Sequence, residues 1–207
     1  MTTIAKAPDA ALVRRGLRLN YLSLGYNALE AVASIAAGVV AGSVSLTGFG
    51  IDSVVEVSAS LAAQWRLRSP TELAERYTRQ IVGVCFLALA AWVLYEAIET
   101  LVRQRPPERS VVGIIILALS VVVMPVLARA KRRVARSLRS GALEAEAKQT
   151  SLCAYLSAIA LVGVALNTLL GWWWADPLAA LAMTPIIAKE GIEGVASARP
   201  DGSAATR

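Results

Sequence analysis

The sequence predicts an all-α fold, a bundle of six transmembrane helices with both termini on the cytoplasmic side. Composition gives the first indication, because 56% of the 207 residues are hydrophobic, only 17% are charged, and mean hydropathy is +0.56. A soluble domain with a polar surface does not usually reach this balance. The other indications are apolar stretches of about 20 residues, the length of a membrane span, and an alternation of basic connections.

The apolar stretches predict one six-helix transmembrane domain over residues 18–195. A cytoplasmic N-terminal tail, 1–17, precedes it, and a flexible C-terminal tail, 196–207, follows it. The spans are predicted at 18–41, 44–65, 80–102, 111–129, 143–170 and 173–195.

Two connections between the spans are very short. The first is Gly42-Ser43 and the second runs over 171–176, so the first two and the last two helices should form antiparallel hairpins. Asp176, followed by proline, is typical of a helix N-cap and predicts the start of the sixth helix.

Basic residues predict the orientation. The segment before the first span, the connections after the second and fourth spans, and the C-terminal part together hold 18 of the 21 Lys and Arg residues. An excess of positive charge marks the cytoplasmic side, so we predict a multi-pass protein of the plasma (inner) membrane with lipid as its surroundings. Short basic runs between apolar stretches do not form the interleaved basic surface that nucleic-acid binding requires.

The chain contains no histidine. This absence removes the imidazole base of serine hydrolases and the histidine ligands of metalloproteases. We therefore predict that the protein is not an enzyme and carries no permanent cofactor.

The second span carries an acidic pair at membrane depth. Asp52 and Glu56 are four residues apart, so both carboxylates lie on one helix face. A charged side chain at the bilayer centre costs on the order of 2.5–3.5 kcal/mol, and such residues face a protein interior or water and are functional candidates. Two carboxylates this close cannot both stay ionised cheaply, so they should hold a proton or a metal ion.

A polar seam follows one face of the first span. Its members recur at spacings of three and four residues and should line the bundle interior: Asn20, Ser23, Asn27, Glu30 and Ser34. Asn27 and Glu30 are candidates for a transport pathway or a proton relay. Gly38 and Gly42 form a small-xxx-small pair that should allow close helix approach.

The fifth span carries a second polar stripe, which includes Glu146, Gln149 and Cys153. For Cys153 to reach the depth of Glu56, the helix must begin near residue 141. Glu146 would then lie at the cytoplasmic mouth, as a further pathway or relay candidate together with Asp176. A thiolate, an amide oxygen and two carboxylates are a plausible four-ligand set for a divalent transition metal.

The chain resembles the cation diffusion facilitator family. Three stretches carry the resemblance: SGSVSLTGFGIDSVVEVSAS in the second span, GALEAEAKQTSLCAYLSAIALVGVALN in the fifth and WWWADPLAALAM at the start of the sixth. Their order and the six-helix topology agree with the family over roughly residues 18–195. The resemblance implies an exporter of zinc or a similar divalent cation, driven by proton antiport through alternating access in a homodimer.

The resemblance also implies a metal site. In the family the second and fifth helices each donate a pair of ligands four residues apart, and here those positions hold Asp52 and Glu56, and Gln149 and Cys153. The fifth-helix pair departs from the usual histidine and aspartate. The histidine-rich loop and the cytoplasmic C-terminal domain of the family are also absent from this sequence, so a homodimer would form through membrane helices.

Three functions are consistent with these residues. The leading one is export of a divalent transition-metal cation, most simply Zn²⁺, in exchange for protons by alternating access. The second is proton-coupled export of organic cations with Glu30 as the exchanging carboxylate. The third is a non-transporting metal-binding membrane subunit.

Overall fold

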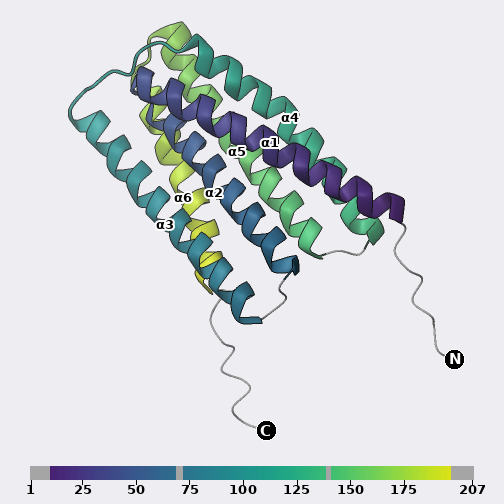
Figure 1. The fold of residues 1–207 in the computed structure, drawn as a ribbon. Helices are drawn as coiled ribbons and strands as arrows, with labels where there is room; N and C mark the ends of the chain where they lie inside the picture. The colour runs from purple at the N-terminus through teal and green to yellow at the C-terminus, as the bar shows by residue number, and fades with distance from the viewer. Residues whose placement is uncertain (1–9, 69–71, 139–140, 197–207) are drawn as a thin grey trace, which may run out of the picture.

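The computed structural model describes residues 10–68, 72–138 and 141–196. They form six helices: α1 (Ala10–Ala41), α2 (Val44–Arg68), α3 (Glu72–Val102), α4 (Val111–Leu138), α5 (Gly141–Leu170) and α6 (Ala175–Ala196). The all-α six-helix bundle predicted from the sequence is confirmed. The start of α1 and the end of α6 lie at the same end of the bundle (Figure 1).

Five of the six described helices are long and apolar enough to cross a membrane. The exception is α6, in which every stretch of 18 residues contains at least three charged residues. Its charges gather near its two ends, at Asp176 and from Lys189 to Glu193, and leave an apolar middle. The packing of α6 between α3 and α5 explains how it can lie inside the bundle despite those charges.

The helices are arranged around a central pair, α2 and α5. Figure 1 shows α3 beside α6 on one side of the bundle and α1 beside α4 on the other. Between them, α2 packs against α1 and α3, and also contacts α5. The polar faces predicted on the second and fifth spans therefore meet in the middle of the bundle.

The turn between α1 and α2 has a defined geometry. Gly42 has φ +62°, and the amides of Gly42 and Ser43 donate to the carbonyls of Val39 and Gly38 at 3.3 and 2.9 Å. This is a Schellman motif, which places glycine at the left-handed position after the last helical residue. Gly42 thus serves the turn, and the prediction that it pairs with Gly38 in helix packing was wrong.

Gly38 does lie at a close helix contact. A Cβ placed on it would meet the backbone nitrogen of Thr47 at 2.6 Å, whereas nothing lies within 4 Å of a Cβ on Gly42. A similar close approach occurs at Gly50, where a Cβ would meet the backbone nitrogen of Ile35 at 2.8 Å. Small residues therefore hold α1 and α2 close together, and this packing brings the seam of α1 to the acidic face of α2.

The helices α1 to α5 extend beyond the spans predicted for them. The start of α5 at Gly141 confirms the start near residue 141 that the depth of Cys153 required. In contrast, Lys131 was assigned to a basic cytoplasmic connection, and this assignment was wrong. The helix α4 continues to Leu138, and the Lys131 side chain is 1% exposed inside the bundle. Its ammonium group lies 3.2 Å from the hydroxyl of Thr150 and 3.4 Å from the carboxylate of Glu146.

Asp176 caps a helix, but not the one that the sequence predicted. Its side chain is fully buried, and its carboxylate accepts hydrogen bonds from the N-terminus of α2. The donors are the Ser43 hydroxyl at 2.7 Å, the Val44 amide at 2.9 Å and the Ser45 hydroxyl. An acidic group at this position satisfies orphan amides and opposes the positive end of the helix dipole. Asp176 thus joins the first turn of α6 to the start of α2.

We expect Asp176→Ala to lower the free energy of unfolding by about 1–3 kcal/mol, because it leaves buried donors of α2 without an acceptor. Asp176→Asn keeps one acceptor oxygen and should cost less. Thermal unfolding of the detergent-solubilised protein measures the effect. Equal stability of Asp176→Ala and the unsubstituted protein would contradict this role.

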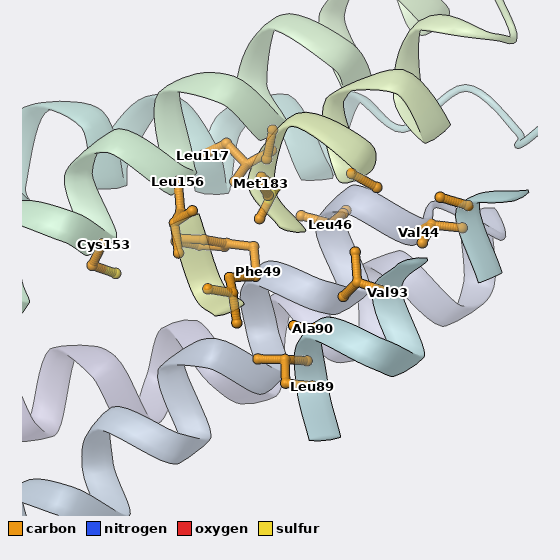
Figure 2. Close-up of a cluster of buried hydrophobic side chains, with 14 of the residues drawn as sticks. Val44, Leu46, Phe49, Leu89, Ala90, Val93, Leu117, Cys153, Leu156 and Met183 are labelled. Atoms are coloured by element: carbon orange, nitrogen blue, oxygen red, sulfur yellow. The ribbon is translucent and has the colours of Figure 1, made fainter. Parts of the chain in front are cut away.

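A buried apolar cluster fills the bundle toward the end where α2 begins. Phe49 and Leu46 of α2 pack there with residues of four other helices, among them Leu117, Leu156 and Met183. Figure 2 shows Cys153 at one edge of this cluster and Val44 at the other. The apolar cluster therefore lies on one side of Cys153, between it and the α1–α2 turn.

Candidate metal centre

The acidic pair of α2 is buried in the middle of the bundle. Asp52 is 2% exposed and Glu56 is 3% exposed, and one helical turn separates them on the same face. No ion pair within the described residues joins either carboxylate to a lysine or arginine. A buried carboxylate without a countercharge is costly unless it holds a proton or binds a cation.

The fifth helix adds a thiol to this pair. Cys153 is completely buried, and its sulfur and one oxygen each of Asp52 and Glu56 all lie within 4.8 Å of one another. At this spacing, a modest movement of the side chains would let all three atoms bind a single cation. The structure thus brings three of the four predicted metal ligands together, from α2 and α5.

Gln149, the fourth predicted ligand, is half-buried on α5 one turn before Cys153. None of the hydrogen bonds between described residues connects its amide to the cluster. The prediction that Gln149 completes the site stays a prediction.

The first helix supplies the neighbours of the cluster. Asn27, which is 6% exposed, donates its amide to Glu56 Oε2 at 2.9 Å and so orients that carboxylate. Glu30, one turn further, is 5% exposed and lies with Oε2 4.0 Å from the Cys153 sulfur. The prediction that the polar seam of α1 lines the bundle interior is confirmed, since Ser23 and Ser34 are buried as well.

A second polar group lies between the cluster and the end of the bundle where α5 begins. Glu146, with a side chain 22% exposed, pairs with Lys131 and accepts a hydrogen bond from Ser60 of α2 at 3.3 Å. Sequence reasoning missed Lys131 because it counted the residue among the topology-setting charges. Its position, three residues after Ala128 and seven after Met124 on one helix face, is the signal of burial that could have found it.

The remaining predicted pathway residue lies at the opposite end. Asp176 is held by the first turn of α2, next to the apolar cluster, and its carboxylate oxygens already accept hydrogen bonds there. The structure therefore gives Asp176 a capping contact and does not bring it to Asp52, Glu56 and Cys153.

The donor set limits the chemistry of the site. Carboxylate oxygens are hard ligands and a thiolate is soft, and this mixture suits divalent first-row transition metals better than Ca²⁺ or Mg²⁺, which prefer oxygen alone. Each ligand binds metal in its deprotonated form, so cation binding at such a site releases protons. The arrangement can exchange protons for a divalent cation at the centre of a membrane domain.

The chain is similar to known membrane proteins. The family model of the cation efflux transmembrane domain matches residues 21–200. An uncharacterized transporter of Synechocystis sp. is 27% identical over 173 residues, which are 78% of this chain and 56% of that protein. The cation-efflux pump FieF of Shewanella oneidensis is 26% identical over 113 residues, which are 55% of this chain and 36% of that protein. The chain thus spans about half or less of the length of these relatives.

Proposed function

Because this chain belongs to the cation efflux family, we propose that it is a secondary transporter that exports a divalent transition-metal cation in exchange for protons. The family and its transporter relatives make the chain an integral, multi-pass membrane protein of a transport family and not of an enzyme family. The substrate, the proton exchange and the direction of transport are our proposal. The name of the Shewanella relative, a cation-efflux pump, supports the outward direction.

One observation carries the proposal. Asp52, Glu56 and Cys153 are buried where α2 contacts α5, and one ligand atom of each lies within 4.8 Å of the other two. A structural role does not account for this cluster, since buried carboxylates without a basic partner weaken a fold unless something positive joins them. A divalent cation or protons would neutralise it, and exchange between the two would couple transport to a proton gradient.

The surroundings of the cluster support alternating access. On one side, the apolar cluster around Leu46, Phe49 and Leu156 separates the site from the α1–α2 turn. On the other side, the path toward the start of α5 is polar, through Ser60, Glu146 and Lys131. We propose that the apolar side closes the site from the outside, and that the polar side is the cytoplasmic approach predicted by the basic connections.

Zn²⁺ is the cation we propose first, because it accepts mixed thiolate and carboxylate ligands at low coordination number. Fe²⁺, Mn²⁺, Co²⁺ and Ni²⁺ share part of this ligand preference. Flux measurements in proteoliposomes, with each of the five metals and with or without a pH gradient, test the function. An acidic interior drives protons out, so metal should enter faster than without the gradient.

Two results would contradict the proposal in different ways. Absence of flux for all five metals, relative to protein-free liposomes, would exclude divalent metal transport. Metal flux that is unaffected by the pH gradient would exclude proton exchange and leave metal transport in place.

A further inference from the structure

The carboxylate of Glu30 on α1 is buried and poorly satisfied. Glu30 is 5% exposed, and its Oε1 has no hydrogen-bond partner among the described residues. Its Oε2 accepts a 3.3 Å bond from the Ser53 hydroxyl, which also lies 3.2 Å from the carbonyl of Phe49, and a weak contact from the Cys153 thiol. The hydroxyls of Tyr26 and Ser120 lie near the carboxylate as well. All of these neighbours are neutral, and neutral groups are weak partners for a buried carboxylate.

Glu30 lies beside the thiol of the cluster. Its Oε2 lies 4.0 Å from the Cys153 sulfur. A metal ion takes sulfur at about 2.3 Å and oxygen at about 2.0–2.2 Å, so two ligand atoms of one ion can be at most about 4.5 Å apart. The separation that the structure has is therefore within the range for two ligands of a single cation, before any side chain moves.

The neighbouring residue on the same helix face points to the same cluster. Asn27 holds Glu56 Oε2 with its amide nitrogen, while its own Oδ1 is buried without a partner. Three further buried oxygens have no hydrogen-bond partner among the described residues, at Asn20 and Ser34 on α1 and at Ser120 on α4. Four of the five unpartnered oxygens among the described residues thus lie on the seam of α1.

We propose that Glu30 is a direct ligand of the transported cation and that α1, with α2 and α5, forms the binding site. This inference rests on the proposed function and specifies the site further. The set becomes the carboxylates of Glu30, Asp52 and Glu56 with the thiolate of Cys153. Three anionic oxygens and one sulfur favour harder divalent cations such as Mn²⁺ more than a site of two carboxylates and a thiolate does.

Metal titration calorimetry of the full chain in detergent, with Mn²⁺ and Cd²⁺ as probes, tests the role of Glu30. Glu30→Gln keeps the side-chain shape, and we expect it to weaken Mn²⁺ binding by about 10–100-fold and Cd²⁺ binding less, since Cd²⁺ relies more on sulfur. Cys153→Ser should weaken Cd²⁺ binding more than Mn²⁺ binding. Glu96→Gln, on α3 and outside the cluster, is the matched control and should leave both affinities unchanged.

Glu30→Asp distinguishes a direct metal ligand from a residue that acts on the site only through its charge. It keeps the negative charge but withdraws the oxygens by one methylene, so a ligand role predicts weaker Mn²⁺ binding in this variant as well. The same variant carries the test if Glu30→Gln does not fold. Unchanged affinities in Glu30→Gln or Glu30→Asp, with binding lost in Asp52→Asn, would overturn the inference and leave the proposed function standing. Unchanged binding in Asp52→Asn would overturn both.

Discussion

Asp52→Asn is expected to abolish metal-dependent flux in proteoliposomes, under a pH gradient or without one. Asn has nearly the shape of Asp, so the packing of this 2%-exposed position should survive. The change removes the negative charge and one anionic oxygen from a cluster of three ligands within 4.8 Å. A neutral amide neither carries a proton in exchange nor binds a divalent cation as a carboxylate does.

The stability of the same variant gives an independent signature of a transport site. Because Asp52 has no basic partner among the described residues, removing its charge should not destabilise the fold and can raise its thermal stability. Loss of flux with equal or greater stability is the expected combination. Glu96→Gln, an acid-to-amide change on a different helix, should retain flux. Full flux in Asp52→Asn would contradict the assignment.

Glu146→Gln is expected to have the largest effect on stability. The Lys131 ammonium group, with a side chain 1% exposed, has Glu146 as its anionic partner at 3.4 Å. Removing the carboxylate leaves a buried positive charge whose remaining hydrogen bond among the described residues is to the neutral Thr150 hydroxyl. Breaking a buried pair from one side costs about 3–5 kcal/mol, and the 22% exposure of Glu146 places this case near the lower end.

The reverse substitution should be milder. Lys131→Met removes the buried charge and leaves Glu146, which is partly exposed and still accepts a hydrogen bond from Ser60. The double variant Lys131→Met with Glu146→Gln should recover most of the stability lost in Glu146→Gln alone. Thermal unfolding in detergent measures all three. If Lys131→Met is the more destabilising single change, the buried lysine does not depend on Glu146.

Much of the fold could be predicted from the sequence, because a membrane imposes a length and a charge pattern on every span. The acidic pair on α2 was predictable for the same reason, since carboxylates at bilayer depth are rare and face the interior. The depth of Cys153 could be predicted from helix geometry, and the resemblance to the cation diffusion facilitator family placed it beside the pair. The start of α5 at Gly141 confirms that reasoning.

The contacts between helices could not be predicted in the same way. Lys131 lies in a basic run beyond the predicted end of the fourth span, and its burial follows from the continuation of α4 to Leu138 and the packing of α4 against α5. Asp176 precedes a proline, as an N-cap does, but tertiary contact gives its carboxylate to α2. Periodicity placed Glu30 on the interior face of α1, yet its 4.0 Å approach to Cys153 depends on how three helices meet.

Cobalt(II) absorption tests the central claim most directly, because a bond between Co²⁺ and a thiolate gives a charge-transfer band that carboxylates do not. The chain has two cysteines, of which Cys153 lies in the cluster and Cys85 is exposed on α3. We predict the band in the unsubstituted protein and in Cys85→Ser, and its loss in Cys153→Ser. A band that persists in Cys153→Ser, or is missing from the unsubstituted protein at saturating Co²⁺, would contradict a cation site at Asp52, Glu56 and Cys153.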